Sequence, residues 1–177
     1  MGSGISSEWS VRNRIREQSH EQDPLLRVSI ASMGIAQMPV ISKLCPMVTA
    51  LDLSNNMIVS LPDHMQRLYL LAVLDVSTNQ LATLPTFLSS FTSLTDLRAS
   101  DNNITELPES LSMSGLTSLS LCRNYLYQGL PPLLCQSFHS SLKTLLLSNN
   151  GLTPPAVSAT LVLLTALVTL NLGTQPT

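Results

Sequence analysis

One motif recurs along most of this chain and limits its fold more than any other feature does. The segment LDLSNNMI, which begins at Leu51, returns with substitutions at Leu74, Leu97, Leu119 and Leu145, at steps of 22 to 26 residues. With the preceding apolar residue, each copy reads LxxLxLxxNxL. Two degenerate copies flank these five, one from Leu25 and one from Leu167, so seven registers can be counted. A fixed period of this length indicates a solenoid in which each unit packs only against its neighbours.

The LxL element of each copy predicts a short parallel strand. Alternate side chains of a strand point to opposite faces, so the leucines should fill the coil while the residues between them point outward. One unit cannot bury its own apolar face, and stacking gives a continuous core. The repeated Asn should close a tight bend, because its amide supplies donors and an acceptor to inward-turning backbone groups. We expect a structural asparagine ladder of Asn56, Asn79, Asn102, Asn124 and Asn150.

The segments that return from one strand to the next fall into two kinds. Four early ones carry an apolar residue followed by Pro, at Met38–Pro39, Leu61–Pro62, Leu84–Pro85 and Leu107–Pro108. Proline fixes φ and lacks a donor, which favours extended or 3₁₀ segments. The later segments, 124–145 and 150–170, are longer and contain apolar runs, so each should hold a short helix.

The repeat from Leu25 to Leu172 resembles the leucine-rich-repeat family, and the Leu-Pro pairs resemble its small intracellular members of the LxxLP type. The resemblance implies an α/β fold: a curved right-handed solenoid with parallel strands on the concave face, and extended or 3₁₀ segments and short helices on the convex side. It also implies protein–protein interaction, as an adaptor or regulatory subunit, often in signalling, but it names no partner.

A domain boundary is expected near Pro24. Residues 1–24 hold seven of the twenty charged residues and none of the repeat, whereas residues 25–177 form the repeat domain, with its last unit incomplete. The opening MGSGIS matches the signal for N-myristoylation of Gly2, although an unmodified start or residues left from cloning would read the same way. The tail has a net charge of −1, so it lacks the basic cluster that would reinforce a single acyl chain. Residues 9–18 predict a short helix that covers the first coil.

Composition and motifs exclude several classes of function. The net charge of −2 and the lack of a Lys/Arg cluster beyond residue 16 argue against nucleic acid. The three histidines are dispersed, and no GxSxG, P-loop or HExxH motif occurs, so we expect no enzyme, cofactor or metal site. Neither a secretory signal nor a transmembrane segment is predicted, since the longest apolar stretch, 156–170, is too short to span a bilayer. Cys45, Cys122 and Cys135 are expected to be reduced, and the protein to be cytoplasmic, at a membrane face if it is acylated.

The repeat register identifies the residues of the concave face. The central column reads Ser29, Asp52, Asp75, Arg98, Ser120, Leu146 and Asn171. Asp52 and Asp75 should be neighbours about 4.8 Å apart, a like-charge contact that a partner's Lys or Arg would relieve. Alternatively, these Asp residues only keep the sheet soluble, and Arg98 neutralises Asp75. The candidate protein-binding residues are Asp52, Asp75, Asp96, Arg98, Asp101, Ser120 and Arg123.

The end of the repeat leaves three explanations open, because the sequence stops at Thr177 in mid-repeat. The chain is a fragment of a larger signalling protein, or its last half-repeat is the cap, or a partner covers the edge. Two functional hypotheses follow. One is a binding module recruited to a membrane through myristoylated Gly2, with a protein partner on the concave face. The other is a cytosolic scaffold or regulatory subunit without lipid, whose C-terminal edge its partner covers.

Overall fold

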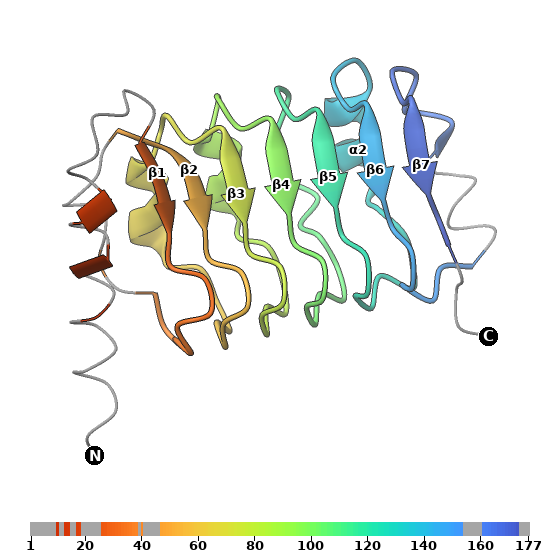
Figure 1. Ribbon diagram of the computed structural model, residues 1–177. Coiled ribbons are helices and arrows are strands. Elements are labelled where there is room, and N and C mark those ends of the chain that lie inside the picture. Colours follow the sequence, from red (N-terminus) through yellow and green to blue (C-terminus); the bar gives the residue numbers. More distant parts are fainter. Residues whose placement is uncertain are drawn as a thin grey trace.

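Seven short strands form one parallel sheet in the computed structural model, which describes residues 26–38, 40, 47–153 and 161–173, together with Ser10, Asn13, Arg14, Glu17 and Gln18. The strands pair in chain order (Figure 1). They are β1 (Leu26–Ser29), β2 (Val48–Asp52), β3 (Val73–Asp75), β4 (Asp96–Arg98), β5 (Ser118–Ser120), β6 (Thr144–Leu146) and β7 (Thr169–Asn171). Consecutive parallel neighbours are what a solenoid produces, because each coil contributes one strand and then returns behind the sheet.

The register of the sheet confirms the columns predicted from the repeat. Leu51 pairs with Leu74, and the same leucine position continues through Leu97, Leu119, Leu145 and Leu170. The central concave column runs in register from Ser29 to Asn171. The one irregularity lies between Leu26 and Arg27 of β1. The repeat therefore fixes which side chains share a face along the whole sheet.

The described return segments follow the two predicted kinds. Two 3₁₀ helices, η1 (Asp63–Arg67) and η2 (Thr86–Ser90), each begin directly after the Pro of a Leu-Pro pair, where the backbone is extended. The helix α2 (Pro132–Phe138) confirms the helix expected between Asn124 and Leu145. The segment between β4 and β5, which carries Leu107–Pro108, contains neither a helix nor a 3₁₀ turn, which the prediction of an extended or 3₁₀ segment allows. The helix expected after Asn150 lies largely outside the described residues.

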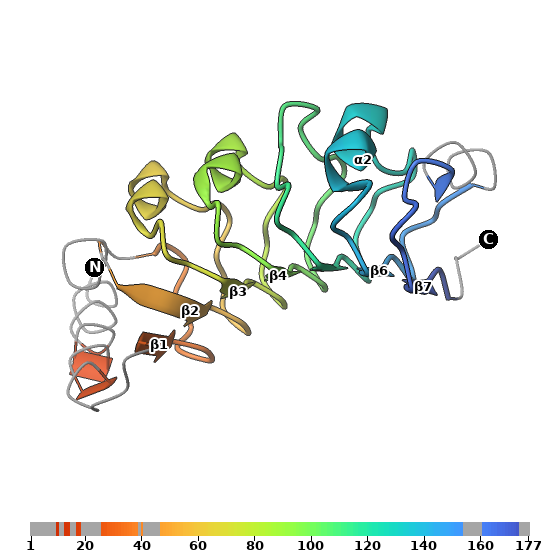
Figure 2. The same ribbon diagram turned by 90° about the horizontal axis from the view of Figure 1, so that it is seen from above.

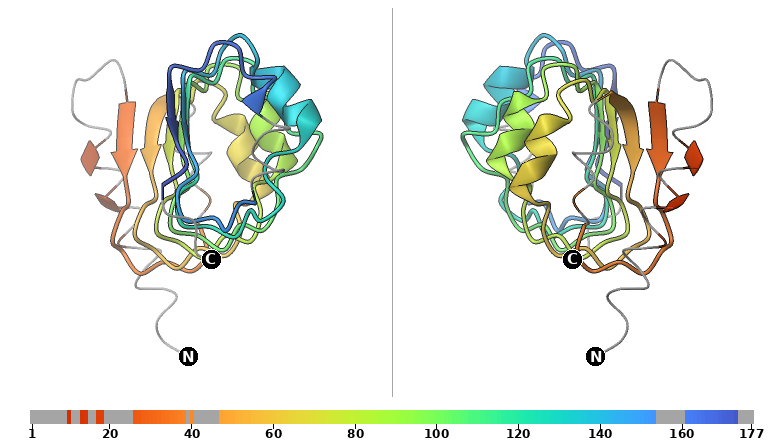
Figure 3. Two further views of the ribbon diagram at one scale, coloured as in Figure 1. Left: turned by 90° about the vertical axis from the view of Figure 1, so that its right-hand side faces the viewer. Right: turned by 90° about the vertical axis from the view of Figure 1, so that its left-hand side faces the viewer.

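Leucines of all coils meet in one core between the strands and the return segments. The sheet lies on one side and the helical segments on the other, as the view along the coil axis shows (Figure 3). The strand leucines from Leu51 to Leu145 are buried, and Met65, Leu88 and Phe138 close the core from the helical side. The row of strands bends into an arc whose inner side is the strand face (Figure 2). These observations confirm the leucine-rich-repeat solenoid, with its strands on the concave face.

Candidate functional site

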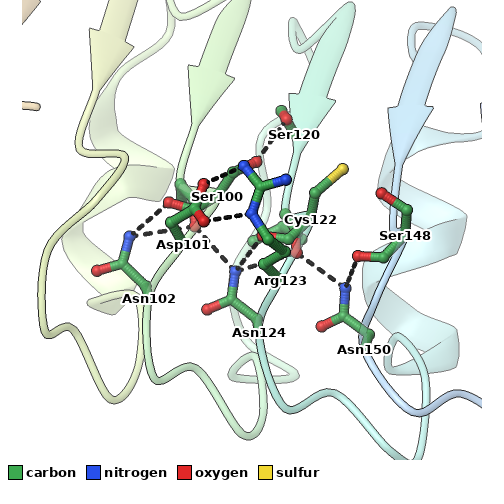
Figure 4. A network of polar contacts seen from close by, with 11 residues as sticks. Ser100, Asp101, Asn102, Ser120, Cys122, Arg123, Asn124, Ser148 and Asn150 are labelled. Atoms are coloured by element: carbon green, nitrogen blue, oxygen red, sulfur yellow. Dashed lines mark hydrogen bonds and ion pairs between the residues drawn. The ribbon is translucent and has the colours of Figure 1, made fainter. Parts of the chain in front are cut away.

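The asparagine ladder holds the turns that end the strands (Figure 4). In Asn102, Oδ1 accepts a hydrogen bond from the Leu81 N–H of the preceding coil at 2.9 Å. Its Nδ2 donates to the carbonyl oxygens of Val76, Ala99 and Ser100 at 3.0 to 3.2 Å. Asn56, Asn79, Asn124 and Asn150 make the corresponding bonds, and all five are buried. The ladder amides are therefore occupied by backbone groups of two successive coils.

A second column, which the repeat did not predict, lies beside the ladder. The residue before each ladder position has a positive φ between 53° and 57°; these residues are Asn55, Thr78, Asp101, Arg123 and Asn149. L-residues other than Asn and Asp rarely adopt this left-handed conformation. The signal was present in the sequence, because three of the five positions carry Asn or Asp. Asp101 and Arg123 therefore belong to these turns and not to the strands.

The carboxylates of Asp52 and Asp75 form equivalent hydrogen bonds at the ends of β2 and β3. Oδ1 of Asp52 accepts the Ser54 N–H at 3.0 Å, and Oδ1 of Asp75 accepts the Ser77 N–H at 2.9 Å. The other oxygen of Asp52 accepts the Ser29 hydroxyl at 3.0 Å. Each carboxylate therefore helps to form its turn, which the sequence reasoning missed. The two charges still stand on paired residues of neighbouring strands.

Arg98 forms a close ion pair with Asp96 and a more distant one with Asp75. Its Nη2 donates to Oδ2 of Asp96 at 2.7 Å, whereas its Nη1 lies 4.0 Å from Oδ2 of Asp75. The hydrogen bond and charge of Asp96 raise the pKa of the Arg98 guanidinium above its ordinary value, with smaller contributions from Asp75 and Asp52. The expected neutralisation of Asp75 is therefore weak, and Asp52 has no ion-pair partner among the residues that the structure describes.

Further along the concave face the charges are paired. Arg123 holds Asp101 with two hydrogen bonds, one of them from Nη2 to Oδ2 at 2.6 Å, and this contact raises the pKa of the Arg123 guanidinium (Figure 4). The Ser120 hydroxyl lies 2.7 Å from that of Ser100. The predicted residues thus differ in how closely they are paired. Asp101 pairs with Arg123, and Ser120 with Ser100, whereas Asp75 has only the 4.0 Å contact with Arg98 and Asp52 forms no ion pair among the described residues.

Asp52 and Asp75 line an open hollow of about 380 Å³ at the N-terminal end of the face. We call it the concave hollow; its lining includes Gln18, Arg27, Ser29, Asp52, Asp75 and Arg98. Gln18 comes from the tail, where it is helical, and its amide pairs with the N–H and carbonyl of Ser29 at 3.0 and 3.3 Å. The tail therefore satisfies part of the free edge of β1 while it bounds the hollow. Arg27 lines the hollow without an ion pair in the described part of the chain.

Several sequence expectations concern other chemistry. Gly2 and Cys45 lie outside the described residues, while Cys122 and Cys135 are free thiols. Within the described ranges, no group of three His, Cys, Asp or Glu side chains could hold a metal ion. No helix there is long and apolar enough to cross a membrane.

The fold is shared with many solved structures, although sequence comparisons return nothing. No model of a known protein family matches the chain, and no curated protein matches it. One similar structure is a leucine-rich-repeat protein of Leptospira interrogans, with a TM-score of 0.71 and 23% identity over 93% of this chain and 46% of that one.

Two other similar structures are complexes. The TLR13–ssRNA13 complex matches with a TM-score of 0.74 and 24% identity, covering 86% of this chain and 22% of that one. The second is the leucine-rich-repeat ectodomain of the Arabidopsis thaliana receptor kinase GASSHO1/SCHENGEN3 in complex with CASPARIAN STRIP INTEGRITY FACTOR 2. It matches with a TM-score of 0.57 and 26% identity, covering 77% of this chain and 19% of that one. The chain spans less than half the length of each of these three proteins.

Proposed function

We propose that this leucine-rich-repeat solenoid is a protein-interaction module, an adaptor or regulatory subunit that docks a protein partner on its concave strand face. The observation that carries the proposal is the concave hollow, where Asp52 and Asp75 stand in one column beside open space. Asp75 Oδ2 lies 4.0 Å from Arg98 Nη1, and Asp52 forms no ion pair among the described residues, although Arg27 and Arg98 also line the hollow. A Lys or Arg side chain of a partner would bridge the two carboxylates.

Charge favours a protein over a nucleic acid at this face. One similar structure contains an RNA and another contains CASPARIAN STRIP INTEGRITY FACTOR 2, so comparable coils accommodate ligands. In this chain the net charge is −2, and the two carboxylates of the hollow offset its two arginines, Arg27 and Arg98, so the hollow is not a basic surface for phosphates. The shallow face also suits a polypeptide surface better than a small molecule.

A double variant tests this proposal without disturbing the turns. Asp52→Asn with Asp75→Asn removes both charges but keeps the Oδ1 acceptors that bind the Ser54 and Ser77 N–H groups. The matched control is Asp63→Asn, an exposed carboxylate on η1. Quantitative affinity purification from cells should lose at least one partner with the double variant and retain it with the control. Equal recovery of every partner from all three proteins would place the site elsewhere.

Membrane recruitment is a separate part of the proposal and rests on the motif around Gly2. A myristoyl group on Gly2 would give reversible membrane binding, and the docked partner would supply the second contact. Gly2→Ala should remove the acyl chain and shift the protein to the soluble fraction, whereas Ser3→Ala, at a variable motif position, should not. A free N-terminal amine in the mass spectrum of the cellular protein would contradict this part alone. The proposal places the protein in the cytoplasm, at that membrane.

The exposed end of the sheet favours a second candidate, a cytosolic scaffold without lipid. All three residues of β7 are exposed, and Leu170, at a core position of the repeat, is 39% exposed. A partner strand paired with β7 would bury this edge. Leu170→Lys should then abolish co-purification of the partner, while the Asp52/Asp75 double variant should keep it.

A further inference from the structure

A second open surface lies on the outer part of the coil, away from the strand columns. It is a hollow of about 480 Å³ between the return segments that follow β4 and β5. We call it the lateral hollow; its lining includes Glu106, Leu107, Glu109, Tyr127, Leu130 and Pro131. Leu107 and Leu130 are buried and form its apolar floor.

The lateral hollow forms where two unlike return segments lie side by side. The segment after β4 has no helical turn and lies between η2 and α2 (Figure 2). The next segment contains α2, and the repeat step there is 26 residues, compared with 22 for the step before it. Because the shorter segment does not match the longer one in shape, the groove between them stays open.

Tyr127 is an exception to the repeat at this place. The corresponding positions of the three preceding coils hold Val59, Ala82 and Thr105, none of them aromatic, and Tyr127 is exposed. Its ring lies against Gly151 of the next coil, where a Cβ atom would come within 2.6 Å of the ring carbon Cδ1. Gly151 thus lets the ring pack closely, which fixes its position beside the hollow. An exposed, fixed aromatic ring is a good partner for a cation.

The charges around the hollow are all negative. Glu106 and Glu109 are exposed, neither forms an ion pair within the described ranges, and no Lys, Arg or His is among the lining residues. A carboxylate pair disfavours anionic partners such as membrane surfaces and nucleic acids. The apolar floor and Pro131 would accommodate the alkyl part of a long basic side chain, whose stem packs on apolar surface while its charge stays near water.

We propose that the lateral hollow binds a Lys or Arg side chain presented by an extended segment of a protein partner. The cation lies near the Glu106 and Glu109 carboxylates and against the Tyr127 ring, and the stem lies over Leu107 and Leu130. This surface is independent of the concave hollow and does not rest on the function proposed for it.

A peptide titration of the full chain tests the proposal. The probe is acetyl-Gly-Ser-Arg-Ser-Gly-amide, and its control is the same peptide with citrulline, which keeps the shape of Arg without the charge. In ¹⁵N-labelled protein, the Arg peptide should shift the backbone amides of residues 105–107, 109 and 127–130, and the citrulline peptide should not. Each chemical-shift titration gives a Kd.

Variants of the lining assign the effect to these side chains. Glu106→Gln with Glu109→Gln should weaken the Kd about three- to tenfold, and Tyr127→Leu about threefold, while Tyr127→Phe, which keeps the ring face, should bind like the wild type. Asp63→Asn, a carboxylate on η1, should also leave the Kd unchanged. An unchanged amide spectrum elsewhere shows that each variant is folded.

Four results would overturn the proposal. The first is equal shifts with the citrulline peptide, and the second is an unchanged Kd after both Glu substitutions. The third is a response confined to the amides around Asp52 and Asp75, which would assign the cation to the concave hollow. The fourth is the appearance of the same shifts without any peptide. If guanidinium chloride alone causes them, the hollow is a simple cation site. If a higher protein concentration causes them, the hollow is a contact between copies of the chain.

Discussion

At the scale of single residues, some side-chain contacts could be predicted from the repeat and others could not. The ladder asparagines satisfy backbone groups of two successive coils, and their place was predictable because only an amide of this length carries both donors and an acceptor. The choice of partner by a charged side chain was not predictable, since Arg98 could reach both Asp75 and Asp96. The repeat places Arg98 opposite Asp75 on the neighbouring strand, but it does not encode the side-chain rotamer that selects Asp96.

Loss of one ladder amide should be costly. Asn102→Ala strands the Leu81 N–H and three carbonyl oxygens inside the protein, so we expect the free energy of unfolding to fall by about 2–4 kcal/mol. Urea denaturation followed by circular dichroism measures this change. The neighbouring Asn103→Ala removes an exposed side chain and should cost less than about 0.5 kcal/mol. Similar losses for the two variants would contradict the role given to the ladder.

Thr78 is the least suitable residue in the left-handed column. It is β-branched, exposed and held at a φ of 55°, where Asn is better tolerated. Thr78→Asn should therefore raise the free energy of unfolding by about 0.5–1 kcal/mol. The same substitution at exposed Thr92, which is outside this column, should give no gain. A gain at both positions would point to an effect unrelated to φ.

At the scale of elements, strands were easier to predict than return segments. A strand of three residues has its place fixed by the Leu and Asn around it, and six pairings follow from the repeat. A return segment only has to span the distance behind the sheet, so similar sequences differ: Pro62 and Pro85 lead into 3₁₀ helices, but Pro108 does not. The lateral hollow arises from this freedom and was therefore not foreseen.

The helix α2 contributes a buried thiol whose titration should affect stability. Burial raises the pKa of Cys135 to about 11 from 9.0. The folded state thus holds this proton more tightly than the unfolded state does. The contribution of the protonated thiol to the free energy of unfolding is therefore fully present below about pH 9, and it is lost as the pH rises towards about 11. The free energy of unfolding should decline over this range more steeply in the wild type than in Cys135→Ala. Parallel curves for the two proteins would refute the assignment.

The whole molecule is a row of coils in which each supports its neighbours. Leu145 and Leu170 occupy the same repeat position, yet Leu145 is buried between two coils, whereas Leu170 is 39% exposed. The sequence gives both leucines the same role, and only their position in the row separates them. Stability should therefore depend on the place of a residue along the solenoid as much as on its type.

A pair of equivalent substitutions measures this dependence. Leu145→Ala should lower the free energy of unfolding by about 3 kcal/mol or more, because the cavity lies between packed coils. Leu170→Ala removes a partly exposed side chain and should cost less than about 1 kcal/mol. Urea denaturation of both variants at one temperature gives the comparison. Equal costs would indicate that the last strand is as enclosed as the inner ones.

The even spacing of the strands limits how a ligand can follow this surface. Neighbouring strands are about 4.8 Å apart, whereas an extended peptide advances about 3.3 Å per residue, so ten residues cover about seven strand intervals. A straight peptide laid across the coils matches the columns at one point and is out of step with them a coil or two later. An extended peptide can therefore contact only two or three adjacent coils in register. A ligand that contacts more coils in register must bend with the arc.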